Sequence, residues 1–153
     1  MERTLVIFKP DSLNRGLVGE ILHRFERKGL KIIGIKMMHL DDKIVHDHYG
    51  HLKDKEFFPG LKRYMQSTPS IVCALEGYNA VSVVRTLTGV TKGYDALAGT
   101  IRGDFSISKQ FNVIHASDSE TTAKIEVKRF FAESELFEYE KMDLEFIYDK
   151  DEL

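Results

Sequence analysis

The sequence predicts an α+β sandwich of the ferredoxin-like type, in which helices cover a four-stranded antiparallel sheet. Three observations support this fold class. The chain has four short apolar runs of strand character, amphipathic segments separate these runs, and the elements follow the order β-α-β, helical insertion, β-α-loop-β-α. With 153 residues and apolar and charged contents of 42% and 30%, we expect one folded domain over residues 1–153.

The chain begins with a predicted strand–helix–strand unit. Thr4–Phe8 is an apolar run rich in β-branched residues, and Lys9-Pro10-Asp11 then predicts a turn. Apolar side chains recur every three or four residues and predict a helix over about 17–28, with Gly29 as its C-cap. Alternation of apolar and polar residues over 31–40 predicts a half-buried second strand.

A helical insertion follows this unit. The polar segment 41–55 predicts a helix that Asp41 or Asp42 caps, and Phe57–Met65 predicts a second, shorter helix. Strand character returns at Ile71–Leu75, which we expect to be the third strand.

The last third of the chain carries the most informative loop. Asn79 is the predicted cap of the next helix, and residues 89–103 form a long loop rich in glycine and threonine. Loops of this length within a compact domain are usually functional. An apolar run then leads into His115, and Ser117-x-x-Glu120 matches a capping box that predicts the start of the last helix.

Composition argues against several classes of function. The net charge of −2 offers no bulk attraction for nucleic acid or an anionic membrane, and no run approaches the roughly 20 apolar residues of a membrane helix. The start of the chain does not read as a signal peptide, and the single cysteine, Cys73, suits a reducing compartment, so we expect a cytoplasmic protein. Lys150–Leu153 spells an endoplasmic-reticulum retention address, which we expect to be coincidental because nothing directs entry into the lumen.

The stretch around His115 predicts an anion site. A histidine at a strand end, before a helix N-terminus with free backbone N–H groups, is placed to meet a phosphate. Lys9, Arg85 and Arg102 supply the ammonium and guanidinium groups that bind phosphoryl oxygens. Taken alone, each of these cations is better explained as a surface charge, and His115 as a hydrogen-bonded residue at a strand end.

The helical insertion carries two further groups of candidate residues. The first group is Tyr49, Phe57, Phe58 and Leu61. These side chains either stack on a nucleotide base or belong to the core, and no P-loop, GxGxxG fingerprint or Ser-His-Asp pattern accompanies them. The second group is His46, His48 and His51. No acidic or cysteine partner stands at metal-site spacing, so a solvated helix face is favoured over a zinc site.

Several motifs together are highly specific. They read ERTLVIFKPD, RGLVGEILHRFERKG, HYGHLKDKEFFPGLKRYM, LEGYNAV, GTIRGDF and NVIHASDS, and they lie within a stretch from Glu2 to Phe131. With these motifs the chain resembles the nucleoside diphosphate kinases, and the last motif is similar to the active-site signature of that family. The resemblance implies ping-pong transfer of the γ-phosphate of a nucleoside triphosphate to a nucleoside diphosphate, through phosphohistidine at His115, which maintains nucleoside triphosphate pools.

The resemblance also implies roles for other residues. Glu126 would hold the second nitrogen of His115, because the imidazole must be neutral to attack, and Ser117 would support the histidine. The nucleotide-binding residues implied are Lys9, Tyr49, Phe57, Leu61, Arg85, Thr91, Arg102 and Asn112. They divide into donors for the phosphoryl oxygens, contacts to the ribose hydroxyls, and a clamp on the faces of the base. The implied cofactor is Mg²⁺, bridging the phosphates of the nucleotide and not held in a protein cage.

The resemblance leaves assembly and alternatives to be tested. It implies a homo-oligomer, with a hexamer favoured over a tetramer, and neither nucleic acid nor membrane as a partner. The loop over 89–99 lacks the prolines usual in the family, so we expect it to be flexible unless a neighbour holds it. A catalytically silent nucleotide-binding or scaffolding relative would lack His115, Lys9 or Arg102, and all three are present. A nucleic-acid-binding regulator would need a basic stripe, which the acidic balance opposes.

Overall fold

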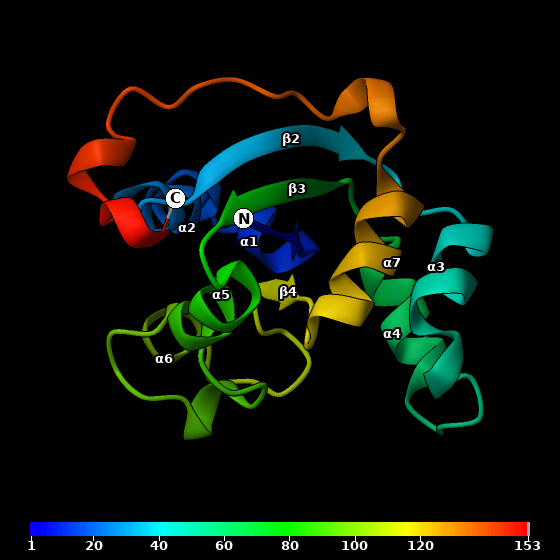
Figure 1. Cartoon of the computed structure of the whole chain (residues 1–153). Coiled ribbons are helices and arrows are strands. Elements are labelled where there is room, and N and C mark those ends of the chain that lie inside the picture. Colours follow the sequence, from blue (N-terminus) through cyan, green and yellow to red (C-terminus); the bar gives the residue numbers. More distant parts are fainter. Residues whose placement is uncertain (153) are drawn as a thin grey trace.

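The computed structural model describes residues 1–152, and within them the strands form one antiparallel sheet in the order β2-β3-β1-β4 (Figure 1). The strands are β1 (Glu2–Phe8), β2 (Lys31–Met38), β3 (Ser70–Gly77) and β4 (Ile114–Ala116). The four-stranded antiparallel sheet with its helices confirms the predicted fold class for these described residues.

Strand β1 lies inside the sheet and is covered on both faces. Leu5 and Ile7 pack into one hydrophobic cluster, while Val6 and Phe8 pack into the other. Because successive side chains of a strand point to opposite faces, a strand covered on both sides reads as an unbroken apolar run. This explains why LVIF gave a clear strand signal without alternation.

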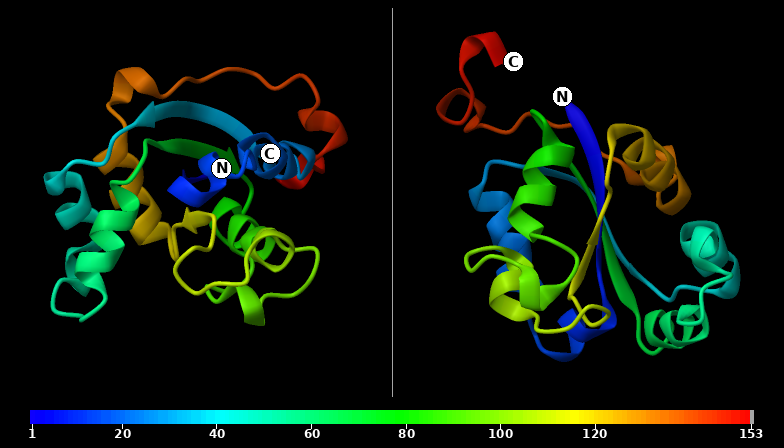
Figure 2. Two further views of the ribbon diagram at one scale, coloured as in Figure 1. Left: turned by 180° about the vertical axis from the view of Figure 1, so that it is seen from behind. Right: turned by 90° about the horizontal axis from the view of Figure 1, so that it is seen from below.

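Two layers of helices cover the two faces of the sheet (Figure 2). One layer contains α3 (Asp42–Tyr49), α4 (Phe58–Met65) and α7 (Glu120–Phe130), and the other contains α2 (Val18–Arg27), α5 (Ala80–Thr88) and α6 (Ile101–Phe105). A short helix, α1 (Pro10–Asn14), directly follows β1. Single 3-10 turns lie at Gly50–Leu52, Gly93–Asp95, Glu133–Glu135, Leu144–Phe146 and Lys150–Glu152.

Several local predictions are wrong in a physically informative way. Lys9-Pro10-Asp11 is not a simple turn, because Pro10 occupies the first position of α1, where its missing N–H costs no hydrogen bond. Asn79 takes the N-cap position of α5 with a left-handed φ of 48°, but its side chain makes no capping hydrogen bond. The second strand ends at Met38 and does not extend to residue 40.

Helix α6 begins within the predicted loop over residues 89–103 and ends at Phe105. Thr100 caps this helix by accepting a hydrogen bond from the backbone N–H of Gly103. The remaining loop is held by its neighbours. Gly93 N donates to Ser108 O at 3.0 Å, and Asp104 accepts from Gly99 N at 2.7 Å. These hydrogen bonds restrain the loop backbone, as proline residues would.

The C-terminal tail crosses beside β2 toward α2 (Figure 1). Phe137 N donates to Ile33 O, and the Tyr139 hydroxyl donates to Ile32 O, both at 2.8 Å. In the described part of the chain, no helix has the length and apolar character needed to cross a membrane. Leu153, the last residue of the predicted coincidental retention address, lies outside the described residues.

Candidate active site

A cavity of about 650 Å³ gathers the predicted site residues from helices, strands and loops that are distant in sequence. The predicted residues that line it are Lys9, Tyr49, Phe57, Leu61, Arg85, Thr91, Arg102, Asn112, His115 and Glu126. Ser117 is fully buried and does not line the cavity. The tertiary structure thus brings together the residues selected from separate motifs.

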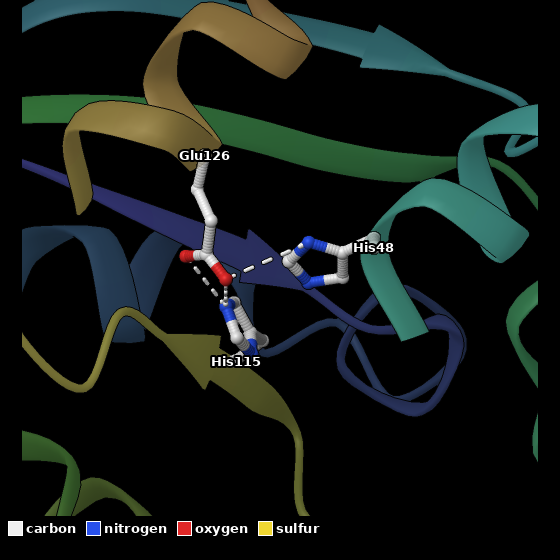
Figure 3. Close-up of side chains that lie close together, drawn as sticks. All are labelled: His48, His115 and Glu126. Carbon is white, nitrogen blue, oxygen red and sulfur yellow. Dashed lines mark hydrogen bonds and ion pairs between the residues drawn. The ribbon is translucent and has the colours of Figure 1, made fainter. Parts of the chain in front are cut away.

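His115 and Glu126 form the centre of the site (Figure 3). His115 Nε2 lies 3.0 Å from Glu126 Oε2 and 3.1 Å from Oε1. A carboxylate only accepts hydrogen bonds, so the ring proton belongs on Nε2 and the lone pair on Nδ1. Nδ1 makes no hydrogen bond within the described residues and is the nitrogen available to attack an electrophile.

Ser117 supports Glu126 and does not cap the helix. Its hydroxyl donates to Glu126 Oε2 at 2.6 Å. The N-cap of α7 is Ser119, which accepts from Thr122 N at 3.1 Å, so the predicted capping box at Ser117-x-x-Glu120 is wrong. Because α7 starts at Glu120, Ser117 lies before the helix and is not its N-cap. Its side chain instead reaches Glu126 in the second turn of the helix.

A tight turn precedes the histidine. Val113 has a φ of 60°, and Ile114 N donates to Asn112 O at 2.7 Å across it. A β-branched residue at positive φ is strained, typically by about 1–3 kcal/mol, and such strain persists only where the surroundings enforce it. Asp11 Oδ2 accepts from Val113 N at 3.0 Å, and Lys9 N donates to Val113 O at 2.9 Å, so the segment after β1 holds the turn.

Lys9 lies at the cationic end of the cavity. Its ammonium group donates to Asn112 Oδ1 at 2.6 Å, and the Asn112 amide donates in turn to Thr91 O at 2.8 Å. Burial, reinforced by the positive charge of Arg102, lowers the pKa of Lys9 to about 8. A buried ammonium paired only with a neutral amide is prepared for an anionic ligand.

Arg102 joins three parts of the site. Its guanidinium donates from Nη1 to Gly89 O and from Nη2 to Ile114 O, both at 2.7 Å. Within the described residues Nε has no hydrogen-bond partner, and burial, with a smaller contribution from Arg85, lowers the pKa of Arg102 to about 10. Arg102 therefore braces the loop after α5 against β4 in addition to bringing positive charge to the cavity.

Aromatic and aliphatic side chains line another part of the same cavity. Leu61 is buried, while the ring of Phe57 remains 48% exposed and is free to cover a flat ligand. Tyr49 is buried, its hydroxyl has no partner in the described part of the chain, and burial raises the pKa of this hydroxyl. Phe58 belongs to the hydrophobic core and does not line the cavity, so of its two predicted roles the core role is correct.

His48 and Asp118 are among the residues lining the cavity that were not predicted from the sequence to belong to the site. His48, predicted to lie on a solvated helix face, is buried, and its ring packs edge-on against His115 with centroids 4.5 Å apart. Asp118 lines the cavity beside Arg85 and was read only as part of a polar helix start. No local pattern marks either residue, because the partners of His48 come from β4 and α7.

Comparison with known proteins identifies the family. A profile described as nucleoside diphosphate kinase matches residues 2–136. The chain is 55% identical to the nucleoside diphosphate kinase of Parabacteroides distasonis over 152 residues, which is 99% of each chain. It is 46% identical to that of Archaeoglobus fulgidus, over 98% of this chain and 99% of the relative.

The chain belongs to the nucleoside diphosphate kinase family. A solved nucleoside diphosphate kinase of Halobacterium salinarum, in complex with CDP, superposes with a TM-score of 0.95 at 41% identity, covering 97% of this chain and 99% of that one. The enzyme transfers the γ-phosphate of nucleoside triphosphates to nucleoside diphosphates, and the alternative of a silent relative is not favoured. The predicted family, fold class and enzymatic activity are therefore confirmed.

Proposed function

We propose that His115 is the nucleophile of this nucleoside diphosphate kinase and carries the phosphoryl group between the two nucleotides. The observation that supports this role most directly is the hydrogen bonding of His115 Nε2 to Glu126, which leaves Nδ1 with a lone pair. Nδ1 attacks the γ-phosphorus, the bond from that phosphorus to the β–γ bridging oxygen breaks, and the nucleoside diphosphate leaves. A second diphosphate then attacks the phosphorus, the N–P bond breaks, and the free histidine returns.

The cations of the cavity stabilise the transferred group. Lys9 and Arg102 are buried, so their charges act in a low-dielectric site where water screens them little. Tyr49 adds a neutral hydroxyl donor, and Arg85 and Thr91 line the same cavity. We assign these residues to the phosphoryl oxygens, where negative charge spreads in the transition state.

The apolar residues hold the nucleoside. We assign Phe57 and Leu61 to the faces of the base and Asn112, with Lys9, to the ribose hydroxyls. Contact with the face of a base reads little of its identity, which suits a kinase that accepts many nucleotides. The CDP complex of the Halobacterium salinarum relative supports a nucleotide in this cavity.

The donor set fits Mg²⁺ that arrives with the nucleotide. The carboxylates lining the cavity are Asp118 and Glu126, and the oxygens of Glu126 are engaged with Ser117 and His115. Mg²⁺ prefers an octahedron of oxygens and keeps several waters, so it would be held through the phosphates, with Asp118 available on the protein side. When bound, the ion neutralises phosphate charge.

The remaining assignments concern the chain as a whole. We propose one kinase domain over residues 1–153 and a homo-oligomer, with a hexamer favoured over a tetramer. The exposed side chains of Ile35 and Met37 on the edge strand β2 support contact between copies. We propose a cytoplasmic location because one cysteine suits a reducing compartment. Light scattering on the purified protein measures the number of subunits.

Labelling with γ-labelled ATP and Mg²⁺ tests the nucleophile. We expect an acid-labile, alkali-stable phosphoprotein that any nucleoside diphosphate discharges. His115→Ala should abolish the label, while His23→Gln, which changes an exposed histidine on α2, should retain it. Label retained in the His115 variant would refute the mechanism.

A further inference from the structure

A second histidine faces the catalytic pair. His48, from α3, places Nδ1 at 3.6 Å from Glu126 Oε1, while His115 Nε2 lies 3.0 Å from Glu126 Oε2 (Figure 3). One ligand atom from each of these three residues lies within 4.8 Å of the other two. The site therefore combines two imidazoles and one carboxylate, the donor set of many zinc centres.

The unprotonated nitrogen of His48 lies next to Glu126, and its lone pair accepts a hydrogen bond from Arg129. Arg129 Nη1 lies 3.2 Å from His48 Nδ1, and a guanidinium can only donate, so Nδ1 accepts and the ring proton is on Nε2. The imidazole is buried and packs edge-on against Tyr49, His115 and Phe130. Packing thus fixes the ring with an unprotonated nitrogen turned toward Glu126.

We propose that His48, His115 and Glu126 form an inhibitory binding site for a transition-metal dication, with Zn²⁺ as the best match. Zinc accepts imidazole nitrogen and carboxylate oxygen at about 2.0–2.2 Å, whereas Mg²⁺ selects oxygen alone. Ligand atoms of one tetrahedral zinc lie about 3.3 Å apart, so closing the cluster needs shifts of about an ångström. The cavity provides the entry path and room for a water as fourth ligand.

The inhibition follows from the tautomer of His115 and rests on its proposed role as nucleophile. A metal on Nε2 uses the lone pair of that nitrogen, so the ring proton moves to Nδ1. Nδ1 then has no lone pair with which to attack the γ-phosphorus, and the phosphoenzyme does not form. The metal also takes the carboxylate that orients the imidazole.

Arg129 opposes the metal. Its guanidinium occupies the lone pair of His48 and places a positive charge beside the site. We therefore expect substitutions of His48 and Arg129 to change zinc affinity in opposite directions. Removing the imidazole of His48 weakens zinc binding, whereas removing the charge of Arg129 strengthens it.

Calorimetric titration of nucleotide-free, Mg²⁺-free protein with ZnCl₂ tests the site. We expect one zinc per chain in the unsubstituted protein, affinity lowered roughly tenfold or more in His48→Gln, and tighter binding in Arg129→Gln. His51→Gln is the matched control: His51 lines the same cavity but is not part of the cluster, so its affinity should not change. Visible absorption of Co²⁺ reports the same site without any assay of activity.

Labelling with γ-labelled ATP in excess Mg²⁺ then connects binding to chemistry. The phosphoenzyme yield should fall as zinc occupies the unsubstituted protein and His51→Gln, and should resist the same zinc concentrations in His48→Gln. Equal zinc affinity with and without His48 would overturn the site. A loss of zinc affinity in His51→Gln as large as that in His48→Gln would also overturn it. Zinc binding that depends on His48 but leaves the phosphoenzyme yield unchanged would overturn the inhibition, while loss of the label in His115→Ala would still support His115 as the nucleophile.

Discussion

The hydroxyl of Ser117 lies 2.6 Å from Glu126 Oε2, the same oxygen that lies 3.0 Å from His115 Nε2. Three residues from β4, the segment after it and α7 thus form one hydrogen-bonded chain that ends at His115, the proposed nucleophile. Ser117 does not reach the cavity, so it acts on the reaction only through Glu126. This arrangement makes Ser117 a positioning residue.

Ser117→Ala should lower kcat by roughly tenfold, because it removes one hydrogen bond to a charged acceptor, worth about 1.5 kcal/mol or more. Nucleotide affinity should change little. Ser119→Ala is the control, since it removes the cap of α7 and should destabilise the fold by about 1 kcal/mol without an equal loss of kcat. Steady-state kinetics and thermal melting of both variants measure the difference. Similar kcat values in the two variants would contradict the role of Ser117.

Glu126→Gln should slow phosphoenzyme formation by at least about a hundredfold. The amide keeps the shape of the carboxylate but carries no charge, and it replaces one of the two acceptor oxygens near Nε2 of His115 by a donor NH₂ group, so it holds the Nε2–H tautomer less firmly. Rapid quenching with labelled ATP measures this step apart from binding. A rate close to that of the unsubstituted enzyme, with normal nucleotide affinity, would show that the tautomer of His115 does not depend on Glu126.

Nucleotide affinity should fall as pH rises through about 8, because Lys9, whose pKa burial and Arg102 lower to that value, loses its charge there. Calorimetry at pH 7 and pH 9 measures the change, and Lys9→Met should remove this step. A pH dependence that is the same in both proteins would assign the step to another group.

The stability of the nucleotide-free protein should change in the opposite direction. The native pKa of Lys9 lies below the ordinary lysine value of 10.5, so between about pH 8 and 10.5 the unfolded chain binds more protons than the native one. The contribution of Lys9 to the free energy of unfolding therefore rises with pH across that window. In denaturant titrations, the difference in the free energy of unfolding between the unsubstituted protein and Lys9→Met should stay constant below pH 8 and shift in favour of the unsubstituted protein between about pH 8 and 10.5.

Arg102→Lys should lower both stability and kcat/KM, although it keeps the charge. An ammonium group cannot reproduce the two hydrogen bonds to Gly89 O and Ile114 O, and their loss should cost about 2–3 kcal/mol in the free energy of unfolding. Arg85→Lys provides the comparison, because Arg85 lines the same cavity without such a brace. Thermal melting should separate the two variants, and equal melting temperatures would exclude the bracing role.

Much of the fold could be predicted from periodicity. The strand and helix centres followed the apolar pattern, because burial on a helix face or a strand face imposes a fixed spacing. The predictions were wrong where hydrogen bonds, and not burial, determine the backbone conformation. Pro10 opens a helix, α6 forms inside a glycine-rich loop, and Ser119 takes the cap expected at Ser117.

The candidate site also has some features that could be predicted from the sequence and others that could not. The sequence by itself determined the family and the chemical character of the site, because the motif residues carry charges, an imidazole and aromatic rings whatever their neighbours are. Only the tertiary structure decided that Glu126 holds Nε2 of His115 and that His48 turns inward to meet both. These residues come from α7, β4 and α3, and their contacts depend on how two helices pack on one face of the sheet, which no local spacing encodes.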